Sequence, residues 1–188
     1  MSFLLSIPIV AFLCSIPFGL VFATIGYDID PRQHHSCNIG MSNVWRCCGM
    51  WAGIFTLIFD ILKAFLSLWI CSILNPPYFL FLAFFCVFFH CFSLYMPKEG
   101  GKGVASAGGV LLFLSPSIFG FAFATWITLR LLFKKASLAS LGTTLLALVY
   151  VGIYETQYLF VLLSMTALIL WRHKENIIRI REKREFSF

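Results

Sequence analysis

The stretch "VASAGGVLLFLSPSIFGFAFATWITLRLLF", Val104 to Phe133, decides the fold. It has thirty residues, more than the roughly 20 apolar residues that a helix needs to cross the hydrocarbon core of a bilayer. The segment "SPS", Ser115 to Ser117, interrupts it. Proline lacks an N–H and disfavours helical geometry in the residue before it. The stretch therefore crosses a membrane either once, as one long helix, or twice, with a turn at Pro116.

The composition of the whole chain places it in a membrane. Of its 188 residues, 60% are hydrophobic, 18% are aromatic and only 12% are charged, a balance that no soluble domain of this length keeps in solution. Little mass is left outside the membrane, so we predict one helical domain, residues 1–188, whose chemistry sits in short loops. The net charge of +6 indicates orientation and anionic ligands, and we expect no nucleic acid partner.

Five other apolar runs are predicted to cross the membrane. The first of them lacks the basic leader and the clean cleavage site of a signal peptide, so we expect a retained helix, with a signal peptide as the alternative. The five runs are Ser2 to Ile25, Met50 to Leu74, Tyr78 to Met96, Leu138 to Gly152 and Gln157 to Trp171.

The positions of Lys and Arg decide between the two routes of the thirty-residue stretch. A single crossing would place Lys134 and Lys135 opposite the earlier basic loops, whereas two crossings put every basic loop on one side, as the positive-inside rule requires. We therefore predict an all-α, polytopic integral membrane protein with seven transmembrane helices and short cytoplasmic active-site loops. Its amino terminus is outside and its carboxyl terminus is cytoplasmic. The basic segments are Tyr27 to Arg46, Met96 to Gly103, Arg130 to Lys135 and Arg172 to Arg184.

One basic residue, Lys63, falls within a predicted span. It follows Asp60 by three residues, which places both side chains on one face of a helix. A charge inside the membrane needs a partner, so we expect these two to pair with each other or with loop groups.

The cysteines indicate neither disulfides nor a metal. All seven lie mostly in apolar stretches without the even, loop-borne spacing of a disulfide framework, so we expect reduced thiols. Two histidines and three cysteines crowd one polar loop, but they lack the paired spacings of a tetrahedral zinc site, and we predict no metal. These five are His34, His35, Cys37, Cys47 and Cys48.

Three loops on the predicted cytoplasmic side carry side chains that suit a phosphate or a polyol. The first loop offers hydroxyls, amides and an arginine, and the second offers Lys102 among glycines whose backbone a ligand can approach closely. The third places two polar residues three apart on one helix face. The residues are Ser36, Asn38, Ser42, Asn43, Arg46, Gly100, Gly101, Gly103, His173 and Asn176.

Each loop also has a simpler interpretation. A glycine-rich loop is often a hinge, Ser and Asn cap helices, and a basic segment contacts lipid headgroups. A Walker-type nucleotide loop is excluded, because Met96 and Gly103 stand where that motif needs Gly and Ser or Thr. The convergence of the three loops on one face favours a binding site.

Six short motifs resemble the PlsY family of bacterial acyl-phosphate:glycerol-3-phosphate acyltransferases, in order and in approximate spacing over nearly the whole chain. They are "SIPFG" (Ser15 to Gly19), "DPRQHHSCNIGMSNVWR" (Asp30 to Arg46), "DILK" (Asp60 to Lys63), "GGKGVASAGG" (Gly100 to Gly109), "SLAS" (Ser137 to Ser140) and "RHKEN" (Arg172 to Asn176).

The resemblance implies a seven-helix enzyme of the bacterial inner membrane that needs no cofactor. It implies transfer of a fatty acyl group from acyl phosphate to the 1-hydroxyl of glycerol 3-phosphate, which yields lysophosphatidic acid and phosphate. Its partners would be these substrates and membrane lipid, and docking of the enzyme that makes acyl phosphate stays open. An inactive or altered-substrate relative, or a transporter of a small phosphorylated solute, is the alternative.

The family motifs assign roles to the residues. Ser36, Arg46 and Lys102 take the catalytic positions, with the two cations on phosphate charge. The resemblance favours direct transfer, although an acyl-enzyme through Ser36 stays open; the chain has no H-x4-D pair, the general base of other glycerolipid acyltransferases. The substrate-binding positions fall on Asn38, Ser42, Asn43, Gly100, Gly101, Gly103, His173 and Asn176.

Three positions depart from the family pattern. His35 and Cys37 replace glycines, and Glu99 replaces a lysine for which the neighbouring Lys98 could substitute. If the two glycines serve a left-handed backbone, side chains there cost about 1–3 kcal/mol or require a reshaped loop.

Overall fold

The computed structural model describes residues 2–74, 79–97 and 99–187, and within these ranges every regular element is helical. Tyr78, with which the third predicted span begins, lies outside the described residues, as do the rest of the "NPPY" turn and Lys98. The α-helices are α1 (Ser2–Ser15), α2 (Phe18–Tyr27), α3 (Met41–Cys48), α4 (Met50–Ile73), α5 (Phe79–Cys91), α6 (Val104–Leu114), α7 (Pro116–Phe133), α8 (Ala136–Tyr154), α9 (Leu159–Arg172) and α10 (Lys174–Arg181). Two 3₁₀ turns, η1 (Pro31–Gln33) and η2 (Thr156–Tyr158), join them.

The decisive stretch forms two helices, as predicted. Ser115 is extended (φ −158°, ψ 110°) between α6 and α7, and Pro116 occupies the first turn of α7, where its missing N–H costs nothing. The hydroxyls of Ser115 and Ser117 donate to Glu155 Oε1 at 2.7 and 2.6 Å, which ties this turn to the end of α8. The chain reverses here, and α6 and α7 pack against each other.

Within the described ranges, four helical segments are long and apolar enough to cross a membrane: Leu5–Tyr27, Met50–Ile73, Pro116–Phe133 and Ala136–Tyr154. Three shorter apolar segments accompany them: Phe79–Cys91, Val104–Leu114 and Thr156–Arg172. The helix α6, with 11 residues, is only about 16 Å long at a rise of 1.5 Å per residue. The loop that precedes it packs against α5, since the buried Gly100 and Gly103 lie against Cys91 and Val87.

The first predicted span is broken. α1 ends at Ser15 and α2 begins at Phe18, because Pro17 cannot continue the helix. Lys63 Nζ donates to the carbonyl oxygen of Ile16 at 2.8 Å and pairs with Asp60 Oδ1 at 2.7 Å, both side chains being buried. The expected pairing of Lys63 is confirmed, and its ammonium also satisfies a backbone carbonyl at the break.

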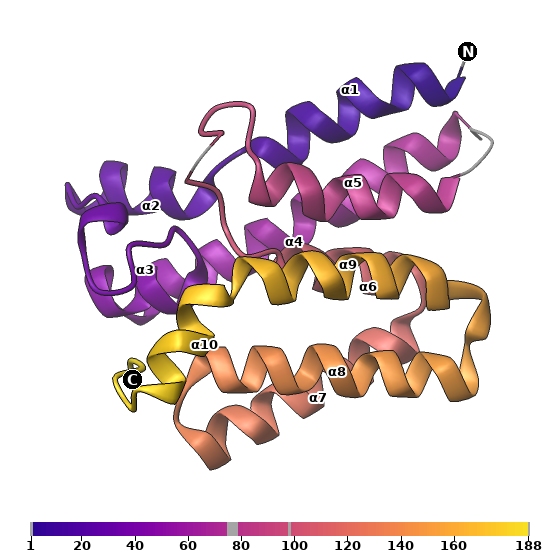
Figure 1. Cartoon of the computed structure of the whole chain (residues 1–188). Coiled ribbons are helices and arrows are strands. Elements are labelled where there is room, and N and C mark those ends of the chain that lie inside the picture. Colours follow the sequence, from indigo (N-terminus) through magenta and orange to yellow (C-terminus); the bar gives the residue numbers. More distant parts are fainter. Residues whose placement is uncertain (1, 75–78, 98, 188) are drawn as a thin grey trace.

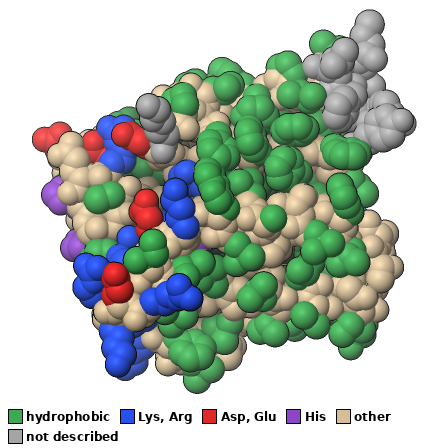
Figure 2. Space-filling model, in the orientation of Figure 1, with side chains coloured by type: hydrophobic (Ala, Val, Ile, Leu, Met, Phe, Trp, Pro, Cys, Tyr) green, Lys and Arg blue, Asp and Glu red, His purple; other side chains and the backbone are tan. Residues whose placement is uncertain are grey.

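The basic segments gather at one end of the molecule. Figure 2 shows Lys and Arg side chains concentrated at the end where α2, α3 and α10 lie in Figure 1, while many hydrophobic side chains and none of the blue basic ones are seen over the rest of the described surface in this view. Many large apolar side chains are exposed, among them Leu131 (72%) and Phe160 (72%), as lipid-facing residues are. The shared end of the basic segments is the arrangement that two crossings of the decisive stretch predict.

Candidate active site

A cavity of about 200 Å³ begins at the basic end and continues between the helices. Its polar part is lined by residues of the first loop, α3, the loop before α6, and α10. Its apolar arm lies among α4, α6, α7, α8 and α9 and is lined by Leu57, Ile61, Leu111, Phe119, Ala147, Leu162 and Met165. Among the predicted site residues, those that line the cavity are Ser36, Asn38, Ser42, Asn43, Arg46, Lys102, Gly103, His173 and Asn176.

Asn43 organises the first loop. Its side chain is 2% exposed, and its Nδ2 donates to the carbonyl oxygens of Pro31 at 2.8 Å and His34 at 3.1 Å. Its Oδ1 accepts from the backbone N and the hydroxyl of Ser36 at 3.1 and 3.0 Å. The amide is thus engaged within the loop, so the part it plays here is to hold Ser36 in place.

The two replaced glycines keep a glycine-like backbone. His35 and Cys37 both have φ of 50°, in the left-handed region that costs an ordinary residue about 1–2 kcal/mol. Both side chains are exposed. The loop has therefore kept its path and accepts the strain. Next to them, Asn38 Nδ2 donates to the carbonyl oxygen of Gly100 at 3.5 Å, which links the first loop to the second.

The glycines of the second loop serve packing. Gly101 N donates to the carbonyl oxygen of His90 at 3.1 Å, and a Cβ on Gly101 would lie 2.0 Å from His90 Nε2. The sequence predicts that Gly100 and Gly101 present backbone to a ligand, but neither lines the cavity. Their carbonyl oxygens instead accept from Arg172 at 2.6 and 3.2 Å. His90 on α5 braces this loop, and Gly103 (φ 88°) turns the chain into α6.

Lys102 lies in this glycine-rich loop, and its side chain lines the cavity. Its side chain is half-buried, and no hydrogen bond or ion pair joins it to another residue in the part of the chain that the structure describes. Burial, with the nearby charge of Arg179, lowers the pKa of Lys102 to about 8. An ammonium without a protein partner in a desolvated niche is suited to an anionic ligand.

The third group combines α9, α10 and Glu185. His173 Nδ1 donates to the carbonyl oxygen of Ile169 at 2.8 Å, so Nε2 is an acceptor, and burial lowers the pKa of His173 to about 4. Asn176 Nδ2 donates to Glu185 Oε1 at 2.7 Å, while its buried Oδ1 has no partner among the described residues. Burial alone would raise the pKa of Glu185, but hydrogen bonds, chiefly from Asn176, hold it below its usual value. The site thus offers acceptors for hydroxyl groups.

Arg46, near the end of α3, contacts Phe186 and Ser187, which the sequence did not mark as site residues. Its Nε donates to the carbonyl oxygen of Ser187 at 3.3 Å, and its guanidinium lies 5.6 Å from the ring centroid of Phe186. Burial lowers the pKa of Arg46 from its ordinary value. Nothing in the basic composition of this segment marks Glu185 or Phe186, so only the folded chain reveals them.

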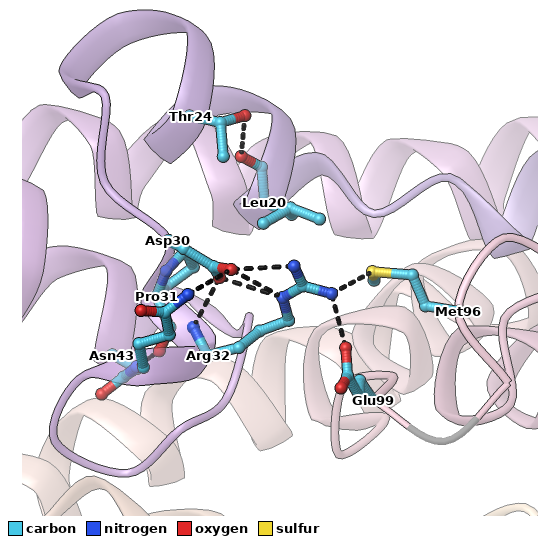
Figure 3. A network of polar contacts seen from close by, with 9 residues as sticks. Leu20, Thr24, Asp30, Pro31, Arg32, Asn43, Met96 and Glu99 are labelled. Carbon is cyan, nitrogen blue, oxygen red and sulfur yellow. Dashed lines mark hydrogen bonds and ion pairs between the residues drawn. The ribbon is translucent and has the colours of Figure 1, made fainter.

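Glu99, which replaces a lysine of the family pattern, forms an ion pair. Glu99 pairs with Arg32, which also pairs with Asp30 at 2.8 Å, so Arg32 lies between two carboxylates (Figure 3). The hydrogen bond from Arg32 lowers the pKa of Asp30 to about 2. This network joins the two loops outside the cavity.

Two chemical expectations concern the cysteines and metals. All seven cysteines are free thiols. Across residues 2–74, 79–97 and 99–187, no three His, Cys, Asp or Glu side chains are grouped as metal ligands.

A helical membrane protein with a cationic cavity that continues into an apolar arm belongs to the class that handles amphipathic anions. Residues 4–183 match the family described as glycerol-3-phosphate acyltransferase, and the chain belongs to this family. The resemblance to PlsY and the expectation of a glycerol-3-phosphate acyltransferase are confirmed.

Individual relatives agree with the family. A glycerol-3-phosphate acyltransferase of Bacillus velezensis is 36% identical over 91% of this chain and 90% of its own length. One of Coxiella burnetii is 36% identical over 98% of this chain and 97% of its own. The crystal structure of PlsY (YgiH) in its glycerol 3-phosphate form has a TM-score of 0.91 and 34% identity, covering 100% of this chain and 96% of that one. Its lysophosphatidic acid form has a TM-score of 0.89 and 33% identity.

Proposed function

We propose that the protein transfers a fatty acyl group from acyl phosphate to the 1-hydroxyl of glycerol 3-phosphate, which yields lysophosphatidic acid and phosphate. One observation carries this proposal. A single cavity combines the cations Lys102 and Arg46, the acceptors of His173 and Asn176, and an apolar arm. These features match a phosphate, a glycerol and an acyl chain.

The chemistry follows from the groups present. Phosphate is a good leaving group, so the site has chiefly to hold two anions close together and to stabilise charge that moves toward the departing phosphate. Lys102 and Arg46 supply that stabilisation, with Asn38 and Ser42 as further polar contacts. His173 and Asn176 accept hydrogen bonds from the glycerol hydroxyls.

The contacts of Ser36 favour direct transfer of the acyl group over an acyl-enzyme. Its hydroxyl donates to Asn43 Oδ1, and among the described residues no histidine is hydrogen-bonded to it. A serine nucleophile needs an adjacent base. We infer that Ser36 contributes hydrogen bonds and that a substrate phosphate accepts the proton of the attacking hydroxyl.

The apolar arm accommodates the acyl chain. It runs along α8 from Ser137 to Ala147, about 15 Å at the helical rise of 1.5 Å per residue. Leu111 and Leu162 line it from α6 and α9. A fatty chain laid in this arm leaves its carbonyl carbon at the polar end, beside Lys102.

In the membrane, we propose that one domain, residues 1–188, crosses seven times in the bacterial inner membrane. α1 with α2, α4, α5, α6, α7, α8 and α9 form the crossings. The end that carries the basic loops faces the cytoplasm, as the positive-inside rule requires, and the amino-terminal end of α1 faces outside.

The decisive experiment uses the purified protein in detergent with palmitoyl phosphate, with and without glycerol 3-phosphate. We expect lysophosphatidic acid and stoichiometric phosphate only when both substrates are present. Lys102→Ala should lower the rate at least about tenfold, since it removes a charge-assisted contact of about 1.5–3 kcal/mol, while Lys174→Ala, an exposed lysine outside the cavity, should not. No product from either mixture would support the inactive relative. Uptake of glycerol 3-phosphate by proteoliposomes without acyl transfer would support the transporter.

A further inference from the structure

The segment after α10 folds back onto the cavity. α10 ends at Arg181, and Lys183 takes a left-handed backbone (φ 57°) that reverses the chain. The backbone N of Arg184 then donates to the carbonyl oxygen of Arg179 at 2.8 Å, which fixes the turn. Glu185 is consequently buried and lines the cavity, and the two residues that follow it lie against α3.

Phe186 sits at the centre of a cationic cluster. Its ring centroid is 5.6 Å from the guanidinium carbon of Arg46 and 5.5 Å from that of Arg179, within the range of a cation–π contact. The ring of His35 meets it edge-on at 6.2 Å. One aromatic ring is thus shared by side chains from the first loop, α3 and α10.

The same segment contacts both arginines through different groups. Glu185 Oε2 accepts from Arg179 Nε at 2.9 Å, so Arg179 is paired with a carboxylate. Arg46 Nε is bound by the carbonyl oxygen of Ser187, a neutral acceptor. A guanidinium held through Nε and through its face has its orientation fixed in two ways.

We propose that Phe186 is a positioning residue for acyl transfer: its ring, together with the carbonyl oxygen of Ser187, orients the Arg46 guanidinium toward the substrate phosphate. This rests on the proposed function, in which Arg46 binds phosphate. The segment Glu185–Ser187 is then a wall of the phosphate site rather than a surface extension of α10.

The test is a double-mutant cycle with acyl transfer as the readout. Phe186→Ala should lower kcat/KM about five- to tenfold, whereas Phe186→Trp, which keeps the aromatic face, should restore most of the parent value. In an Arg46→Lys background, Phe186→Ala should change kcat/KM less than about twofold, because the residue through which it acts is already altered. Phe160→Ala, a matched loss of a lipid-exposed ring on α9 (72% exposed), is the control and should leave kcat/KM unchanged.

Several results would overturn the proposal. If Phe186→Ala leaves kcat/KM unchanged or raises it, the segment is a dispensable cover. If the loss is equal in both backgrounds, or if Phe186→Leu restores activity as well as Phe186→Trp, the ring supports the fold without orienting Arg46. If the parent protein forms no lysophosphatidic acid, the proposed function itself is contradicted. The positioning of Arg46 by Phe186 is then tested by comparing the binding of inorganic phosphate to the parent and to Phe186→Ala.

Discussion

At the scale of single residues, the half-buried ammonium of Lys102 gives the site a pH dependence. Its pKa of about 8 lies below the ordinary 10.5, so the cation that we propose binds phosphate is lost as the pH rises through 8. Because kcat/KM reports on the free enzyme, it should fall above about pH 8. In Lys102→Arg the guanidinium stays charged, so the residual activity should lack this fall.

The contribution of Lys102 to the free energy of unfolding should rise with pH while kcat/KM falls. The opposite signs distinguish titration of Lys102 from unfolding of the protein. A lysine whose pKa is lowered on folding binds fewer protons in the native state between about pH 8 and 10.5, so its contribution to stability improves as the pH rises. Parallel measurements of kcat/KM and of the melting temperature in detergent check both signs. A kcat/KM that stays flat to pH 10, or that falls only where the protein melts, would contradict this assignment.

The strained backbone at Cys37 makes a second prediction at this scale. Cys37→Gly removes the strain of a left-handed backbone, which destabilises the folded state by about 1–2 kcal/mol. Glycine also raises the conformational entropy of the unfolded chain, which offsets about 0.4–1 kcal/mol of that gain. The free energy of unfolding should therefore rise by about 0.5–1 kcal/mol, with acyl transfer retained, since the side chain is exposed. Thermal unfolding in detergent measures it. Cys37→Ser, which keeps the strain, should behave like the parent, and a less stable glycine variant would refute the strain argument.

Residue types and loop membership predicted most of the polar residues that line the candidate site, and contacts between distant residues explain the rest of its lining. Lys102, Arg46 and His173 line one cavity because the basic loops converge at one end. The role of Gly101 was open in the sequence, since a tight fit against the His90 ring and an approach to a ligand both require glycine. Phe186 gave no signal, because its partner Arg46 is 140 positions away and no periodicity links the two.

At the scale of helices, two prolines in the first span behave differently. Pro8 is accommodated within α1, whereas Pro17 separates α1 from α2. The local sequence predicts a similar disturbance at both, but at Pro17 the ammonium of Lys63 binds the carbonyl oxygen of Ile16. Apolar run lengths thus predicted where the apolar helices lie, while the contact between Lys63 on α4 and the carbonyl oxygen of Ile16 accompanies the break at Pro17 and not the uninterrupted helix at Pro8.

The buried pair on α4 should contribute strongly to stability. Lys63→Met leaves the Asp60 carboxylate buried without its cation and the Ile16 carbonyl without its donor, which should cost about 3–5 kcal/mol. The melting temperature in detergent should fall sharply. The double variant Asp60→Asn with Lys63→Met should recover part of the loss, since it removes the uncompensated charge. A Lys63→Met variant as stable as the parent would show that the pair is not needed.

At the scale of the whole molecule, the two ends should face different compartments. Exposed positions at opposite ends, Arg181 and Thr156, allow a matched test in a background without native cysteines. A membrane-impermeant thiol reagent applied to whole cells should label Thr156→Cys and not Arg181→Cys, because the proposed orientation places the basic end in the cytoplasm. The opposite pattern would invert the proposed orientation. Labelling of both positions would contradict the proposal that α9 crosses the membrane between Thr156 and Arg181.

The cavity joins a polar mouth to an apolar arm, and so the two proposed substrates should arrive from different phases. Glycerol 3-phosphate dissolves in water, but a long-chain acyl phosphate partitions into the bilayer at about 0.8 kcal/mol per buried CH₂. The half-exposed Phe123, which lines the arm from α7, gives the lipid side access to it. With acyl phosphate as the proposed donor, the enzyme should respond to the mole fraction of that donor in the surrounding lipid. Adding inert lipid at a constant total amount of donor should slow the reaction by surface dilution, even though no bulk concentration has changed.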